Sequence, residues 1–162
     1  FGEYVYEAML KLPERTSTKP KRYDRDLKAS VDALRFSEDW YKVIGGEDDE
    51  GAIVISQLGD EVDFAISLND RTANLVPVDS IDDVVGAVNA YTQTVGVYPE
   101  SLKAELLNVL PLYGAQRFVS LGFAAMASNA QPQDSLELMR RMGKWVINEI
   151  RTPESCQAPW VD

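Results

Sequence analysis

The sequence has 162 residues, 45% hydrophobic and 26% charged, and its 16 basic and 26 acidic side chains give a formal charge of −10. This length and composition favour a single folded domain over residues 1–162 and exclude a disordered chain. The negative charge argues against nucleic acid or anionic lipid as a partner, and a single cysteine, Cys156, is typical of a cytoplasmic protein without an internal disulfide.

The chain begins with two predicted helices. Apolar residues recur at helical spacing over residues 4–12, where Pro13 ends the run, and again over residues 24–40. The basic stretch at residues 19–22 lies between them and is interpreted as a solvated loop. Residues 1–45 are therefore expected to form a helical lead-in, followed by an exposed turn over residues 45–51.

Residues 52–150 are expected to form the sheet core. Two short β-branched runs, residues 52–56 and 62–66, flank Gly59-Asp60 and predict a β-hairpin. A third run, residues 74–78, contains Pro77 and fits an edge strand.

From Ala73 onward, strands and helices alternate. Ser80 with Asp83 three positions later predicts a capped helix start. Strands are predicted at residues 94–98 and 117–121, with a helix between them that is stopped by Pro111 and Gly114. Asp134 is expected to cap a final helix with an apolar stripe of Leu138, Met142, Trp145 and Val146, and residues 151–162 form a tail. This order predicts an open, mostly parallel sheet with flanking helices, in addition to the β-hairpin.

No catalytic or metal site is evident from the residues alone. The acidic run at residues 47–50 lacks the alternating ligands and turn glycine of a calcium loop, so it is interpreted as surface. Cys156 lies in the tail, and no histidine is present to activate it. The apolar run at residues 123–127 is far shorter than a membrane span. No glycine-rich turn of the dinucleotide-binding type occurs.

Three segments resemble the C-terminal half of the fatty acyl-CoA reductases of the bacterial bioluminescence (LuxC) family, within the aldehyde dehydrogenase superfamily. They are NLVPVDSIDDVVGAVNAYTQTVGVYPESL, GAQRFVSLGFA with its Gly-Ala-x-Arg strand, and PQDSLELMRRMGKWVINE. The opening FGEYVYEAMLKLPE is similar to the helix that follows the catalytic cysteine in that family. The order of these motifs covers most of the chain.

The resemblance implies a role as the framework of the catalytic half of an NADPH-dependent acyl-CoA reductase. In that chemistry a cysteine attacks the acyl-CoA thioester, CoA leaves, and hydride reduces the acyl-enzyme to a fatty aldehyde. The family cysteine would lie upstream of Phe1, so we expect residues 1–162 to be the C-terminal part of a longer, homo-oligomeric reductase. Alone, the chain is expected to be inactive and to bind neither NAD(H) nor NADP(H).

The loop GFAAMASNAQPQD, residues 122–134, follows the last predicted strand, where ligand crevices lie in open α/β sheets. We expect Asn129, Gln131, Gln133 and Asp134 to lie near the mouth of an acyl channel, with Asp134 mainly capping its helix. Close packing of small residues is the alternative reading of this loop. Where the family turn has His and Gly, this sequence has Gln133 and Ser135.

A second functional class is also compatible with the sequence. An acidic α/β module without catalytic activity could assemble through exposed strand edges. Pro77 and the predicted hairpin over residues 52–66 motivate this alternative. The parent protein distinguishes the two hypotheses. A half with a catalytic cysteine and a cofactor site would support the reductase, and the absence of such a half would support the module.

Overall fold

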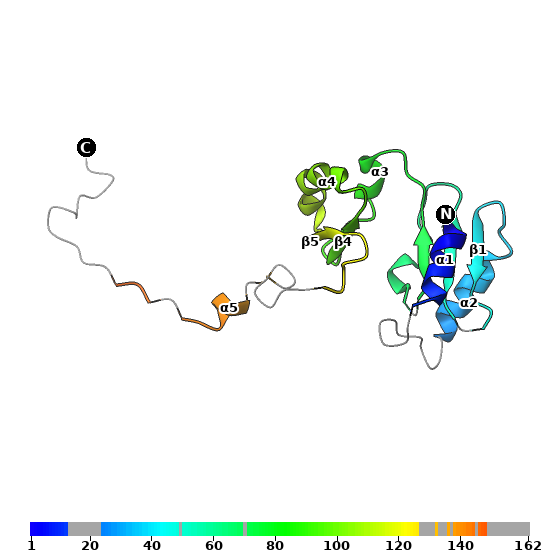
Figure 1. The fold of residues 1–162 in the computed structure, drawn as a ribbon, viewed down its shortest axis with the longest axis horizontal. Coiled ribbons are helices and arrows are strands. Elements are labelled where there is room, and N and C mark those ends of the chain that lie inside the picture. The colour runs from blue at the N-terminus through cyan, green and yellow to red at the C-terminus, as the bar shows by residue number, and fades with distance from the viewer. Residues whose placement is uncertain are drawn as a thin grey trace. The chain divides into compact units, whose positions relative to one another are not determined.

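The computed structural model describes residues 1–12, 24–48, 50–69, 71–126, 132, 136, 138–144 and 146–148. Its contacts group into two compact units, residues 1–87 and residues 88–162. Figure 1 shows both, with the first in blue to green and the second in green to orange. No helix in the described ranges combines the length and apolarity needed to cross a bilayer.

The first unit is built on a mixed sheet in the order β1-β2-β3. Strand β1 (Tyr41–Gly45) runs antiparallel to β2 (Ala52–Ser56), which pairs in parallel with β3 (Ala73–Leu75). The prediction of one open, mostly parallel sheet is therefore wrong for this unit. A turn as short as residues 46–51 can only reverse the chain, since a parallel connection needs a crossover of about a dozen residues.

Two helices cover opposite faces of this sheet. In β2 the side chains alternate, so Ala52 and Val54 belong to the buried cluster that also contains Leu27 and Val31 of α2 (Arg25–Leu34). Ile55 points the other way, toward α1 (Gly2–Leu10). A Cβ on Gly2 would lie only 2.6 Å from the Ile55 Cδ1 atom, so glycine permits this close helix–sheet contact.

The predicted β-hairpin does not form, because β2 pairs with a different strand from the one expected. Residues 62–66 form a turn followed by the short helix η1 (Ala65–Ser67), and β2 pairs instead with β1. Because β1 and β3 occupy both edges of β2, no ladder position is left for a third neighbour. The apolar residues of this segment are still used: Val62 is 1% exposed and lies in the cluster against α2.

The second predicted helix is shorter than its apolar pattern suggested. It ends at Leu34, and the backbone then turns so that the Ser37 carbonyl accepts hydrogen bonds from the amides of Trp40 and Tyr41. The residues after Leu34 offer no apolar stripe to bury, and Phe36 is 91% exposed. The chain therefore leaves the helix early and enters β1, which lies within residues 1–45, so the prediction of a purely helical lead-in is wrong.

The first unit closes with the helix start predicted at Ser80. In α3 (Ile81–Val85) the Ser80 hydroxyl accepts from the Asp83 amide, and the Asp83 carboxylate accepts from the Ser80 amide at 2.9 Å. This capping box confirms the prediction and shows that Asp can take the place usually held by Glu or Gln.

The second unit contains the predicted strand–helix–strand segment. Strands β4 (Thr94–Val97) and β5 (Arg117–Ser120) are parallel neighbours. The helical connection between them consists of η2 (Glu100–Leu102), α4 (Lys103–Val109) and η3 (Leu110–Tyr113). This part of the prediction is confirmed, including the stop at Gly114.

The final predicted helix is shorter than its apolar stripe suggested, because residues 142–144 and 146–148 are described and are not helical. It is the short α5 (Leu138–Arg141), in orange in Figure 1. Its expected cap, Asp134, and the stripe residue Trp145 lie outside the described residues. Met142 and Val146 are exposed, so the described part of the stripe is not buried.

Candidate functional site

The residues expected at the substrate mouth, Asn129, Gln131, Gln133 and Asp134, lie outside the described part of the chain. The structure does describe the first part of their loop, Gly122 to Met126, which directly follows β5. The candidate site therefore consists of this segment and the residues that hold it at the carboxyl end of β5.

The Gly-Ala-x-Arg motif, residues 114–117, leads into β5. Gly114 has φ +124°, and a Cβ there would lie 2.5 Å from the backbone of Asn89, so only glycine fits this approach. Ala115 is buried. The Gln116 amide group donates to the Ala90 carbonyl at 3.0 Å, and its backbone amide donates to the carbonyl of Thr92. The first three residues of the motif thus hold the start of β5 against the residues that precede β4.

Arg117, the last residue of the motif, binds the segment after β5. Its Nη1 donates to the Ala124 carbonyl at 2.8 Å, and its Nη2 donates to the Met126 carbonyl. Phe123 and Met126 in this segment expose 54% and 68% of their surface. A charged group thus holds a short backbone segment that presents apolar side chains.

Polar groups also meet where β4 and β5 end. Glu100 follows β4, Ser120 ends β5, and the Lys103 ammonium lies 3.5 Å from the Glu100 carboxylate. The Ser120 hydroxyl, together with Lys103, holds the pKa of Glu100 below its usual range. An exposed carboxylate with a lowered pKa is a weak general base at neutral pH, so this trio is suited to linking the two strand ends.

The largest electrostatic perturbation lies at the turn between β1 and β2. The Glu50 carboxylate accepts from the Tyr6 hydroxyl at 2.8 Å and from the amides of Gly46 and Asp48, each at 2.7 Å. Burial alone would raise the pKa of Glu50, but these donors and its own amide outweigh it and lower the pKa to about 2. Burial and the bond to Glu50 raise the pKa of Tyr6 to about 12.

Basic side chains on α2 and at Arg35, the residue that follows it, hold the same turn from a second direction. The Lys28 ammonium donates to the carbonyls of Gly46 and Glu47, and the Arg35 guanidinium donates to the carbonyl of Gly45. Glu50, the last residue of the acidic run, therefore points its carboxylate into the turn and toward Tyr6. Within the described ranges, no group of three or more acidic, histidine or cysteine side chains is arranged to hold a metal ion.

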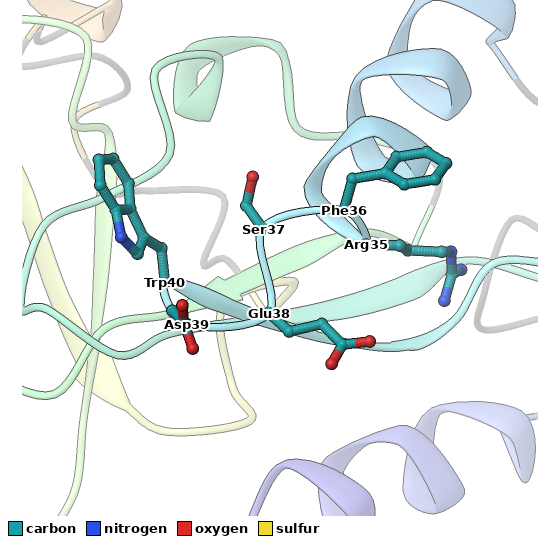
Figure 2. A pocket seen from close by; sticks show the side chains of 6 residues that line it. All are labelled: Arg35, Phe36, Ser37, Glu38, Asp39 and Trp40. Carbon is teal, nitrogen blue, oxygen red and sulfur yellow. The ribbon is translucent and has the colours of Figure 1, made fainter.

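Two open hollows lie beside β1. One, of about 580 Å³, is lined by Arg35, Phe36, Ser37, Glu38, Asp39 and Trp40, and a second, of about 500 Å³, shares Arg35 and Glu38 and reaches Gln57. Figure 2 shows that Phe36 and Trp40 extend in opposite directions from the connection between α2 and β1. Side chains that diverge in this way do not converge on a reacting atom, so we do not assign the chemistry to these hollows.

Two of the described helices, α2 and α3, begin with a side-chain cap. A pyrophosphate needs free N–H groups at a helix N-terminus after a glycine-rich turn. At α2 the Asp24 carboxylate already accepts from the amides of Asp26 and Leu27, and at α3 the Ser80–Asp83 pair caps the first turn. At these two helices, a carboxylate lies where a phosphate would otherwise bind.

Sequence reasoning missed most of these contacts. Tyr6 and Glu50 are separated by 44 positions, and no local pattern links them. Arg117 carried a signal, since it belongs to the quoted Gly-Ala-x-Arg motif, but the sequence alone did not indicate that it would bind carbonyls beyond its own strand. Glu100 and Ser120 could be paired only once β4 and β5 were known to be parallel neighbours.

Comparison with known proteins identifies one family. A family model described as acyl-CoA reductase (LuxC) matches residues 7–145. No curated protein and no solved structure matches the chain. The matched range includes both sheets, the Gly-Ala-x-Arg motif and the loop after β5.

Proposed function

Because the chain belongs to the acyl-CoA reductase (LuxC) family, we propose that it forms the C-terminal framework of the catalytic domain of an NADPH-dependent reductase that converts acyl-CoA to fatty aldehyde. The observation that carries this proposal is the family match over residues 7–145. In this proposal, the described residues help to form the binding site for the acyl group. The nucleophile and the dinucleotide-binding site belong to other parts of the enzyme.

The incomplete burial of the second unit supports a framework role. Parallel sheets are normally covered on both faces, yet β4 and β5 form a sheet of two strands in the described part of this unit. Val97, Leu110 and Ala115 are the buried apolar residues there, whereas Leu112 is 82% exposed and Leu121 is 61% exposed. Further protein packed against these residues would complete the core.

The loop over residues 122–134 is proposed to line the acyl channel. It follows the carboxyl end of a parallel strand, and its described part exposes Phe123 and Met126. An acyl chain needs an apolar wall with few polar groups. Asn129, Gln131, Gln133 and Asp134 are proposed to lie at the mouth of this channel, where amides can contact the polar end of the substrate.

Bulky substitutions in this loop test the proposal. Replacing Ala125 and Ala127 with leucine in the complete reductase is expected to shift preference toward shorter acyl-CoA substrates, because each substitution adds volume to the channel wall. The kcat/KM values for a series of acyl-CoA chain lengths measure the shift. Reduced stability with an unchanged chain-length profile would show that the loop only fills space.

A second candidate function is assembly through the edge of β1 that faces away from β2, which no strand in the described part of the chain covers. The Gln57 amide donates to the Trp40 carbonyl, so residues 42 and 44 face β2, while the backbone N–H and C=O groups of Val43 face away from it. Such an edge can pair with the same strand of a second copy. Val43→Pro removes an outward N–H and leaves the ladder to β2 intact, so it should reduce dimer formation measured by light scattering. An unchanged molar mass would exclude this edge as the interface.

A further inference from the structure

A single side chain controls the course of the segment after β5. The guanidinium of Arg117 donates from Nη1 to the Ala124 carbonyl at 2.8 Å and from Nη2 to the Met126 carbonyl. These carbonyls lie seven and nine positions along the chain from Arg117. The planar fork of donors therefore closes the segment onto the strand from which it emerges.

Little else in the described residues fixes this segment. Two turn bonds support it, from the Phe123 amide to the Ser120 carbonyl at 3.0 Å and from the Met126 amide to the Phe123 carbonyl at 3.1 Å. Gly122 has φ +90°, and a Cβ there would meet open space. The side chains of Phe123 and Met126 are mostly exposed, so no buried apolar anchor replaces the guanidinium.

The charge of Arg117 is directed to backbone carbonyls. Within the described ranges, no carboxylate forms an ion pair with it. Hydrogen bonds from a charged donor are stronger than those from a neutral one, and arginine can satisfy two acceptors held at a fixed separation. A lysine could reach one carbonyl at a time, because its ammonium is a point donor on a flexible stem.

We propose that Arg117 is a positioning residue that selects acyl-chain length by holding Gly122 to Met126 in place, so that Phe123 and Met126 form a fixed apolar surface for the acyl chain. This inference rests on the acyl-CoA reductase function proposed above. Arg117 acts through the loop and makes no contact with the reacting atoms.

The test compares Arg117→Gln and Arg117→Lys in the complete reductase with Arg141→Gln, a control that removes a positive charge from an exposed position on α5. Hydrogen exchange of the Phe123 and Met126 amides reports the loop directly and needs no activity. In Arg117→Gln we expect both amides to exchange about tenfold faster, which corresponds to a loss of roughly 1.4 kcal/mol of local stability. Arg117→Lys should fall between this variant and the wild type.

The second measurement is the ratio of kcat/KM for a long and a short acyl-CoA. We expect this ratio to fall by about tenfold in Arg117→Gln, mainly through KM of the long substrate, with Arg117→Lys again intermediate and Arg141→Gln unchanged. A general loss of folding would instead lower kcat for both substrates together. Arg117→Lys keeps the charge and the stem, so it keeps the test valid if the glutamine variant does not fold.

The outcomes distinguish the positioning role of Arg117 from the proposed reductase function. Unchanged exchange of the two amides overturns the positioning role, and faster exchange with an unchanged chain-length ratio overturns the role in selectivity. A wild-type protein that forms no aldehyde refutes the proposed function itself, while the exchange measurement still decides whether Arg117 holds the loop.

Discussion

Replacing Glu50 with glutamine tests whether one carboxylate holds the turn between β1 and β2. The carboxylate accepts from the Tyr6 hydroxyl and from the amides of Gly46 and Asp48. Glutamine is nearly isosteric, but its NH₂ group faces a donor where the carboxylate had an acceptor. The change therefore removes charge-assisted hydrogen bonds and places two donors against each other.

The size of the effect follows from the pKa of Glu50, which falls from 4.5 to about 2 on folding. At 1.36 kcal/mol per pKa unit, the difference corresponds to at most about 3.4 kcal/mol. Glu50 is only partly buried, so solvent screening reduces the expected contribution to about 1–2 kcal/mol. Because the folded pKa is the lower one, this stability is present above pH 4.5 and is lost as the pH falls through about 2.

The assay is urea unfolding at pH values from 7 down to 2, with Glu47→Gln as the control on the same turn. At pH 7, Glu50→Gln should lower the free energy of unfolding by about 1–2 kcal/mol, while Glu47→Gln should change it by less than about 0.5 kcal/mol. At pH 2 the wild type and Glu50→Gln should converge. A constant difference between them across the whole pH range would refute the assignment of the effect to ionised Glu50.

Three other predictions concern stability. Tyr6→Phe should abolish the loss of stability that the wild type shows as the pH rises from 10 through about 12, because the pKa of Tyr6 is raised in the folded state. Unfolding curves at alkaline pH measure this loss, and parallel curves for the two proteins would contradict the prediction. Asn74→Ala should cost about 2–3 kcal/mol in urea unfolding, because the Asn74 side chain bonds two groups of β2 and the amide of Val62, and a cost below about 0.5 kcal/mol would contradict that role. Gly114→Ala should lower the melting temperature by several degrees, roughly 4–8 °C per kcal/mol in small domains, since the added Cβ meets backbone at 2.5 Å; an unchanged melting temperature would show that the backbone adjusts.

Local signals in the sequence were sufficient where a few neighbouring residues determine the structure. The capping box at Ser80 and Asp83 depends on positions three apart, and the structure confirms it. The strand–helix–strand segment from Thr94 to Ser120 was also predicted, because Pro111 and Gly114 mark the end of its helical part.

Tertiary competition explains the elements that were wrong. The β-branched pattern of residues 62–66 fits a strand, but β1 and β3 already flank β2, so the segment turns and buries Val62 against α2 instead. Strand β1 was missed because residues 41–45 follow a helical pattern without an intervening glycine or proline. Only pairing with β2 makes it a strand.

The contacts of the candidate site also could not be predicted from the sequence. Arg117 was recognised as part of a motif, but its role depends on carbonyls that are brought back to β5 by the path of the following loop. The Tyr6–Glu50 contact joins α1 to the β1–β2 turn and requires the helix to lie against the sheet. Side-chain contacts of this kind follow from packing, which a linear pattern does not record.

The most direct test of the reductase assignment is fatty aldehyde formation from a long-chain acyl-CoA and NADPH. The complete protein and residues 1–162 alone are assayed side by side, with aldehyde quantified by mass spectrometry and NADPH followed by absorbance. The proposal predicts that the complete protein forms one aldehyde for each NADPH oxidised and that residues 1–162 form none. A complete protein that forms no aldehyde, or an isolated chain that does, would contradict it.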